Sequence, residues 1–289
     1  MNKQTPSGFV ATESQTRHEK VDILKQTGNQ WESHADTISV EEPLEIRIAG
    51  PEFEETTLAI TMRTPGCDHE LSLGFLFGEG IIRSLDDVTA LEHCRPPSPD
   101  KGIHNSICVT LKASTPFKLE QLERHFYTSS SCGVCGKTSI DSVMEKNFTS
   151  IGHRFSIRRD QVTRLPTDLK EQQADFSYTG GIHAAGLINS AGDLLTVRED
   201  IGRHNAVDKL IGASLMAGNV PLAGHGLMLS GRAGFELVQK AIMAGIEFVA
   251  AIGPPSSLSV ELAEDAGLTL TGFVSDKGFN LYSHPGRVS

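Results

Sequence analysis

Two cysteines three residues apart, Cys132 and Cys135, are the side chains of this sequence with the most evident chemical potential. They lie in the stretch TSSSCGVCGKTS, residues 128–139, among glycines and hydroxyl side chains. A CxxC pair favours the thiolate form and can close into a reversible disulfide, and thiolates are also metal ligands. The pair therefore indicates metal binding, disulfide exchange or sulfur transfer, and the spacing alone does not choose among them.

Zinc is disfavoured by the residues around the pair. A structural zinc site needs a second CxxC or a close histidine pair, whereas the other cysteines, Cys67, Cys94 and Cys108, are dispersed. A zinc deaminase site needs H-x-E followed by P-C-x-x-C. Here Ser131 stands in place of the proline, and none of the eleven histidines is followed two residues later by Glu. We expect no zinc.

A phosphate-binding loop is also disfavoured, because Ser131 replaces the first glycine of G-x-x-x-x-G-K-[ST] and no buried strand precedes it. Thioredoxin-like disulfide exchange stays open at this point. The segment TSIDSVMEKNF is a candidate helix, and its positive N-terminal end together with Lys137 would favour the thiolate at either cysteine. Such a thiolate can attack a sulfur donor.

Composition limits the classes of protein to consider. Of 289 residues, 38% are apolar, and a formal net charge of −10 argues against a general nucleic-acid binder. No apolar run is long enough to span a bilayer, and the N-terminal residues lack the apolar core of a signal peptide. Five cysteines, an odd number, do not resemble a disulfide framework. We expect a cytoplasmic protein that binds neither nucleic acid nor membranes.

The first half of the chain predicts two regions. Residues 1–36 are polar and predict a mobile tail, and residues 37–127 predict a small α+β domain. A helix should begin near Asp68, which is placed to cap it. Strands are expected over 44–49, 56–63 and 105–112.

The second half, residues 128–289, predicts an α/β/α domain with the CxxC loop at its start. A hairpin over 183–200 turns at Gly192, and an amphipathic helix follows from Arg203. Strands and helices then alternate to Val274, which predicts parallel crossovers and a sheet covered on both faces. The predicted fold class is a three-layer α/β/α sandwich with a smaller N-terminal α+β domain.

Glycines and polar residues cluster directly after the predicted strands. The segments are REDIGRHN (198–205), SGRAG (230–234), GPPSS (253–257) and FVSDKG (273–278). Ligands of open α/β sheets bind beyond the carboxyl ends of the strands, so this edge is where we expect a ligand.

Several long motifs carry a family resemblance. They are SSCGVCGK, TGGIHAA, REDIGRHNAVDKLIG, the run from SGRAG to LTLTGF, and the upstream TPGCDHELSLGFLFGEGII, and together they cover roughly residues 40–288. In these motifs the chain resembles the formate dehydrogenase accessory sulfurtransferase family (FdhD/NarQ). The resemblance implies a cytoplasmic, dimeric sulfur carrier with a domain similar to the cytidine deaminase fold that has lost its zinc site.

The resemblance also implies partners and a substrate. Sulfur would come as a persulfide from a cysteine desulfurase and pass to the molybdenum or tungsten of bis-molybdopterin guanine dinucleotide, before that cofactor enters the formate dehydrogenase catalytic subunit. Cys132 matches the family's persulfide-bearing cysteine and Cys135 its second, auxiliary thiol. The family's nucleotide-binding stretch matches Phe273, Val274, Ser275, Asp276, Lys277 and Gly278.

Such a polyanionic cofactor should be held by cationic side chains and backbone N–H groups at helix starts. Asp276 is placed to accept the N1–H and N2–H of guanine, with GDP as a mimic of the cofactor. The other residues expected to bind are Arg203, His204, Asn205, Ser230, Gly231 and Arg232.

More ordinary interpretations apply to some of these residues. Taken singly, Arg203 and Arg232 fit a structural ion pair as well as a phosphate contact, and Glu199 and Asp200 are placed to cap the helix that begins near Arg203. His183 fits a hydrogen-bonded core histidine better than a catalytic one. For the whole protein, a cofactor-binding chaperone and a thiol-disulfide oxidoreductase are the alternatives to a sulfur carrier.

Overall fold

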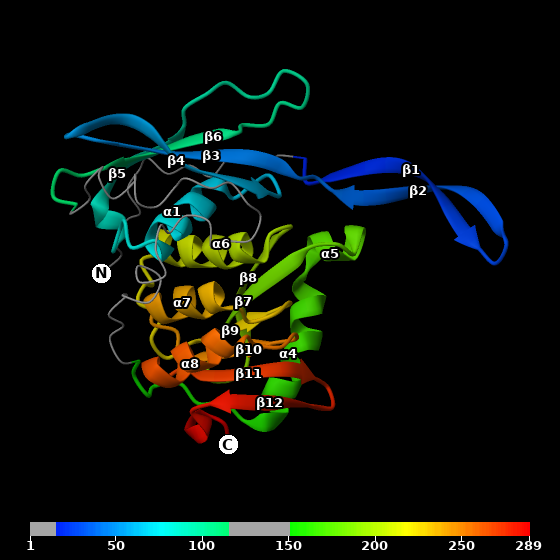
Figure 1. The fold of residues 1–289 in the computed structure, drawn as a ribbon, viewed down its shortest axis with the longest axis vertical. Helices are drawn as coiled ribbons and strands as arrows, with labels where there is room; N and C mark the ends of the chain where they lie inside the picture. Colours follow the sequence, from blue (N-terminus) through cyan, green and yellow to red (C-terminus); the bar gives the residue numbers. More distant parts are fainter. Residues whose placement is uncertain (1–15, 116–150) are drawn as a thin grey trace.

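Two mixed sheets with helices packed between them form the body of the protein (Figure 1). The computed structural model describes residues 16–115 and 151–289. The N-terminal sheet has the strand order β4-β3-β6-β5, and the C-terminal sheet has the order β12-β11-β10-β9-β7-β8. The predicted mixture of α and β elements is confirmed. Among the described helices, none has the length and apolar character needed to cross a bilayer.

The N-terminal sheet has one buried face. Alternate side chains of β3, those of Leu44, Ile46 and Ile48, are fully buried, as expected for a strand with a core face and an outer face. β3 pairs antiparallel with β4 and parallel with β6, and β5 pairs antiparallel with β6. The strands are β3 (Glu42–Gly50), β4 (Phe53–Arg63), β5 (Val88–His93) and β6 (Ser106–Leu111). All but β5 were predicted.

The C-terminal sheet contains the predicted hairpin and the predicted strand-helix alternation. β7 and β8 pair antiparallel, whereas β9, β10 and β11 are parallel to one another. β12, which was not predicted, pairs antiparallel with β11 at the sheet edge. The strands are β7 (His183–Ile188), β8 (Leu194–Asp200), β9 (Gly226–Leu229), β10 (Phe248–Ala251), β11 (Thr269–Ser275) and β12 (Gly278–Ser283).

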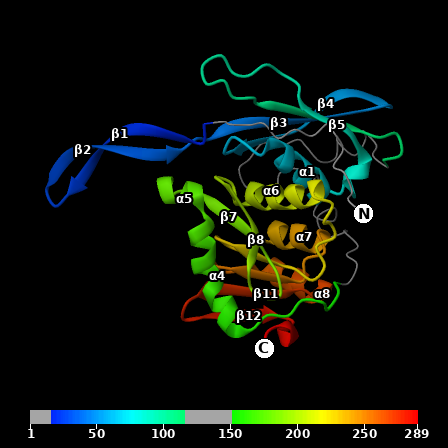
Figure 2. The same cartoon turned by 180° about the vertical axis from the view of Figure 1, so that it is seen from behind.

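Helices lie on both faces of this sheet (Figures 1 and 2). One face is covered by α6 (Arg203–Met216), α7 (Phe235–Met243) and α8 (Ser257–Ala266), and the other by α4 (Arg159–Gln172). Leu227 and Leu229 of β9 belong to the core cluster on the first face, and Met228 between them belongs to the cluster with α4. Strands buried on both faces give the near-continuous apolar runs seen in the sequence.

Two helices, α1 (Asp68–Gly78) and α6, join the sheets through a close crossing. A Cβ placed on Gly74 would lie 1.8 Å from the carbonyl oxygen of Asp208, and one on Gly212 would lie 1.8 Å from that of Glu70. The two backbones touch at these glycines, so no larger residue fits there. One continuous apolar cluster therefore runs from β3 through both helices to β9.

Asp68 does not cap α1, contrary to the prediction. Cys67 is the N-cap residue and makes no side-chain cap, while Asp68 is the first residue of the helix. The buried carboxylate of Asp68 instead accepts two hydrogen bonds from the guanidinium of Arg63, at 2.8 and 3.0 Å. This bidentate pair ties the end of β4 to the start of α1.

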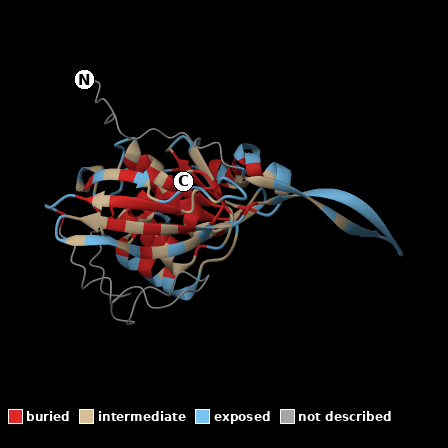
Figure 3. Ribbon diagram, turned by 90° about the horizontal axis from the view of Figure 1, so that it is seen from above, coloured by how far each residue is buried: buried red, intermediate tan, exposed pale blue. Residues whose placement is uncertain are grey.

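A hairpin of β1 (His18–Thr27) and β2 (Gln30–Ser39) projects from the body, and most of it is exposed (Figure 3). Most of it lies within the segment 1–36 that was predicted to be a mobile tail, whereas the structure shows regular strands from His18 onward. The strands were missed because this ribbon buries almost nothing: Leu24 and Trp31 are 69% and 66% exposed. Without a buried face, the sequence carries no alternation to reveal its strands.

Candidate ligand-binding cleft

A cavity of about 880 Å³ opens at the carboxyl ends of the parallel strands. Ser230 follows β9, Ile252 follows β10, and Val274 and Ser275 end β11, with Asp276 directly after them. All five residues line the cavity. The cavity therefore lies at the sheet edge where the sequence predicted a ligand.

The opposite wall comes from a region that the sequence analysis left unassigned. α4 contributes Pro166 and Lys170, α5 (Ala174–Thr179) contributes Phe176, and Gln173 lies between the two helices. The signal for α4 was present, since Val162, Leu165 and Leu169 are buried and follow helical spacing. The proline inside the helix obscured that pattern.

The segment FVSDKG forms an irregular hairpin between β11 and β12. Phe273 has a φ of 53°, unusual for a residue other than glycine, and the strand register shifts between Gly272 and Ser275. This irregularity leaves Phe273 51% exposed while Val274 stays buried. Such backbone strain is concentrated at functional sites. The Oγ of Ser275 donates to the carbonyl of Gly278 at 3.2 Å.

Two neutral histidines lie near the cleft. Burial and the charge of Arg203 lower the pKa of His183, which lines the cavity. Burial, then Arg203 and Lys240, lower the pKa of His204 to about 3. A carboxylate oxygen of Glu236 lies 3.2 Å from the Nε2 of His204 and alone would favour protonation, but burial and the two cations outweigh it. His204 is therefore neutral although it lies beside this carboxylate.

Two of the residues predicted to bind ligand, Asn205 and Ser230, already make hydrogen bonds to other groups of the protein. The Nδ2 of Asn205 donates to the carbonyl of Met62 at 2.7 Å and to Asp200 at 3.0 Å, and its Oδ1 accepts from Thr61 at 3.1 Å. Asn205 thus links α6 to the N-terminal sheet. The Oγ of Ser230 accepts the backbone N–H of Ala184 at 2.8 Å.

The two acidic residues at the end of β8, Glu199 and Asp200, contact different helices. Asp200 accepts the N–H of Gly202, just before α6, at 2.8 Å, and its other carboxylate oxygen lies 2.7 Å from Lys209. Glu199 does not cap α6, as had been proposed for both residues. It accepts the N–H groups of Asp175 and Phe176, both at 2.9 Å, and so caps α5 beside the cavity.

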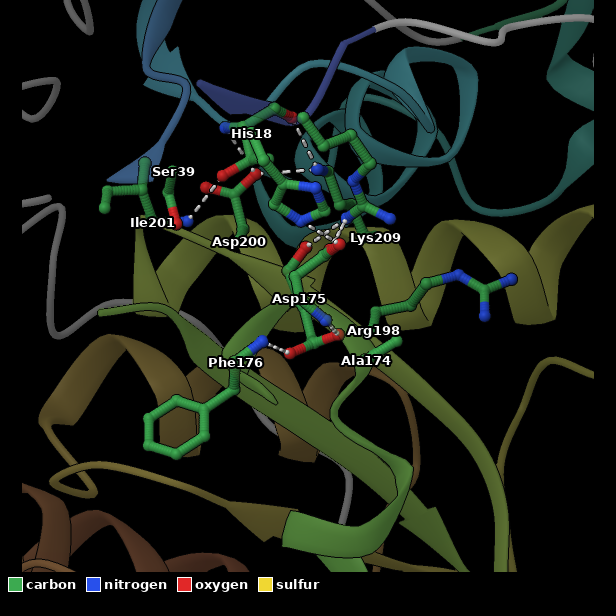
Figure 4. Close-up of polar contacts among 12 residues, drawn as sticks. His18, Ser39, Ala174, Asp175, Phe176, Arg198, Asp200, Ile201 and Lys209 are labelled. Carbon is green, nitrogen blue, oxygen red and sulfur yellow. Dashed lines mark hydrogen bonds and ion pairs between the residues drawn. The ribbon is translucent and has the colours of Figure 1, made fainter. Parts of the chain in front are cut away.

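The base of the projecting hairpin is fixed to the same short helix α5 (Figure 4). Asp175 lies 2.6 Å from a guanidinium nitrogen of Arg17 and 2.8 Å from the Nε2 of His18. The Oγ of Ser39 donates to the hydroxyl of Thr179 at 3.0 Å. These contacts and the Glu199 cap hold α5 from two sides.

The cavity therefore collects four of the residues that the sequence analysis expected to bind, Ser230, Val274, Ser275 and Asp276. The expected residues that do not line it are Arg203, His204, Asn205, Gly231, Arg232, Phe273, Lys277 and Gly278. Cys132 and Cys135 lie outside the described residues. Within residues 16–115 and 151–289, no group of three or more His, Cys, Asp or Glu side chains is arranged to hold a metal ion.

Fold and cleft together define a mixed α/β protein with a cavity at the carboxyl edge of its larger sheet. The FdhD/NarQ family matches residues 39–289, and the chain belongs to that family.

Named relatives match almost the whole chain. A protein named sulfur carrier protein FdhD from Mycolicibacterium paratuberculosis is 43% identical over 92% of this chain and 97% of its own length. A protein of the same name from Nocardia farcinica is 46% identical over 88% of this chain and 88% of its own length. Another, from Saccharolobus solfataricus, is 38% identical over 94% of this chain and 98% of its own length. A crystal structure described as a formate dehydrogenase accessory protein, from Desulfotalea psychrophila, superposes with a TM-score of 0.74 at 21% identity, covering 95% of this chain and all of that one.

Proposed function

We propose that this protein is a sulfur carrier that supports formate dehydrogenase by transferring persulfide sulfur to a guanylated metal cofactor. The observation that carries the proposal is the position of Asp276, from the family's nucleotide-binding stretch, on the wall of an 880 Å³ cavity. The names of relatives support it, one of them 47% identical over 86% of this chain. A cytoplasmic location, a homodimer and a likeness to the cytidine deaminase fold belong to the same proposal.

The proposed chemistry begins at Cys132. Its thiolate attacks the outer sulfur of a persulfide on a cysteine desulfurase, the S–S bond breaks, and the desulfurase leaves as a thiol, so that Cys132 now carries the persulfide. Attack by the thiolate of Cys135 on the inner sulfur would then release sulfide with its electron pair and leave a disulfide. A cellular thiol would reduce that disulfide and restore the carrier.

The substrate of the second transfer is bis-molybdopterin guanine dinucleotide, with molybdenum or tungsten as the sulfur acceptor. The cavity has a volume of about 880 Å³, within the ~300–1,000 Å³ typical of ligand sites. Asp276 would accept the N1–H and N2–H of a guanine, because a carboxylate pairs well with two adjacent donors. Arg203 and Arg232, which do not line the cavity, are proposed to meet the phosphates outside it.

Replacing Cys132 distinguishes a sulfur carrier from a protein that only binds and delivers the cofactor. In cells whose formate dehydrogenase depends on this protein, Cys132→Ala should abolish dehydrogenase activity, and the purified variant should bind GDP as tightly as the parent. Cys108→Ala serves as the control, because Cys108 is buried in β6 with its thiol pKa raised to about 11. Full dehydrogenase activity with Cys132→Ala would favour the chaperone function instead.

A further inference from the structure

Gln173 has an unused hydrogen-bond donor at the cavity wall. The residue is 6% exposed, and its Nε2 has no hydrogen-bond partner among the residues that the structure describes. Gln173 itself lines the cavity. Buried side-chain amides are normally paired, and leaving one unpaired costs free energy. A buried donor in a cavity wall without a partner is the arrangement expected of a group that awaits a ligand acceptor.

The backbone of Gln173 is well fixed. Its N–H donates to the carbonyl of Lys170 at 3.3 Å, and its carbonyl accepts the N–H of Ser177 at 3.2 Å. The N–H groups of Asp175 and Phe176, two and three residues further on, donate to the Glu199 carboxylate, and Asp175 is also paired with Arg17 and His18. The side chain therefore belongs to a junction between α4 and α5 whose backbone is held on both sides, as precise ligand recognition requires.

Two other hydroxyl groups of the wall already make hydrogen bonds within the protein. The hydroxyl of Ser230 accepts the N–H of Ala184, and that of Ser275 donates to Gly278. The Asp276 carboxylate is an acceptor that lines the same cavity. Besides Lys170 and His183, the wall thus presents a carboxylate acceptor and a buried amide donor, with apolar surface from Ile252 and Val274.

We infer that Gln173 selects guanine by donating from its Nε2 to the O6/N7 edge of the base, while Asp276 accepts from N1–H and N2–H. The inference rests on the proposed function, since it names the base that this cavity recognises. Guanine presents two acceptors on that edge, whereas adenine presents one acceptor and an amino donor. A site built to pair with a particular group discriminates against a base that lacks the group.

The test is equilibrium binding of GDP, IDP and ADP to the full-length protein. Gln173→Met removes the donor and roughly preserves the volume. We expect it to weaken GDP and IDP about tenfold each and ADP less than twofold, because IDP keeps O6 and N7 and lacks only the 2-amino group. Asp276→Ala should instead reduce the preference for GDP over IDP.

Gln172→Met is the matched control, since Gln172 is the exposed last residue of α4 and does not line the cavity. It should bind all three nucleotides like the parent. If Gln173→Met lowers the melting temperature, Gln173→Glu, which keeps the size but replaces the donor with an acceptor, should still lose GDP binding. GDP affinity within twofold of the parent in a folded Gln173 variant overturns the inference and leaves the proposed function standing. A parent protein that binds no GDP overturns both.

Discussion

Most of the polar side chains discussed at the cleft fall into two groups. Asn205, Ser230 and Glu199 are bonded within the protein and position its elements. Gln173 and Asp276 line the cavity and are proposed to meet the ligand. His204 belongs to neither group, because it is held neutral beside the start of α6 by burial and neighbouring cations.

The neutral state of His204 predicts a pH dependence. The pKa of this histidine is about 3 in the folded protein and close to 6.5 in the unfolded chain. Below pH 6.5 the unfolded chain binds a proton that the folded protein excludes, so stability is present above 6.5 and is lost as the pH falls toward 3. Between pH 7 and 5, the parent should lose about 2 kcal/mol more unfolding free energy than His204→Asn does.

Urea denaturation of both proteins at pH 7 and pH 5 measures that difference. His153→Asn, at an exposed histidine away from the cleft, is the matched control substitution. Equal losses in the parent and in His204→Asn would show that His204 accepts a proton in the folded state.

At the scale of elements, α5 connects the hairpin, β8 and the cavity. Its N-terminal end is capped by Glu199, its Asp175 contacts Arg17 and His18, and Phe176 lines the cavity. A helix of only six residues is not stable alone, so these contacts must hold it in place.

Glu199→Gln should therefore weaken both stability and ligand binding. The substitution removes the charge from two hydrogen bonds at 2.9 Å and should cost about 1–2 kcal/mol of unfolding free energy. GDP affinity should fall as well, since Gln173 and Phe176 lie at the same end of α5. Thermal denaturation and GDP titration measure the two effects. Glu171→Gln is the control, because Glu171 is exposed at the end of α4. An unchanged GDP affinity in Glu199→Gln would contradict the expectation that the position of α5 affects ligand binding.

The elements also show what sequence patterns can reveal. The run from β7 to β11 was predicted nearly to its boundaries, because strands buried on both faces and amphipathic helices leave strong periodic signals. β1 and β2 were missed because they bury almost no apolar surface, and α4 because Pro166 interrupts its pattern. The expectation that ligands bind beyond the carboxyl ends of the strands located one wall of the cleft. The other wall is formed by α4 and α5, which that expectation does not include. Gln173 could not be identified, since an unpaired amide is a property of the folded packing and not of a motif.

At the scale of the whole molecule, the two sheets share one hydrophobic core. The crossing of α1 and α6 at Gly74 and Gly212 brings the helix backbones into contact. Behind it, the buried Lys209 lies 2.7 Å from Asp200 and donates to the carbonyl of Thr64 at 2.9 Å, which ties the C-terminal half to the end of β4. The two halves should therefore unfold together.

Calorimetry of the parent and of Gly74→Ala tests this coupling. The parent should unfold in a single transition. The added methyl group would lie 1.8 Å from a backbone oxygen, so the helices must separate, at a cost of about 3 kcal/mol. Gly286→Ala, where the added group meets nothing within 4 Å, should change little. Two separate transitions in the parent would contradict a shared core.

The central claim, sulfur transfer through Cys132, is tested most directly by mass spectrometry of the whole protein and its peptides. The purified protein is mixed with a cysteine desulfurase and cysteine, and the peptide carrying Cys132 is examined for one added sulfur. We expect the sulfur on Cys132, lost on reduction and absent from Cys132→Ala. If both thiols of the CxxC pair stay unmodified while GDP still binds, the protein is not a sulfur carrier and the cleft serves a cofactor chaperone.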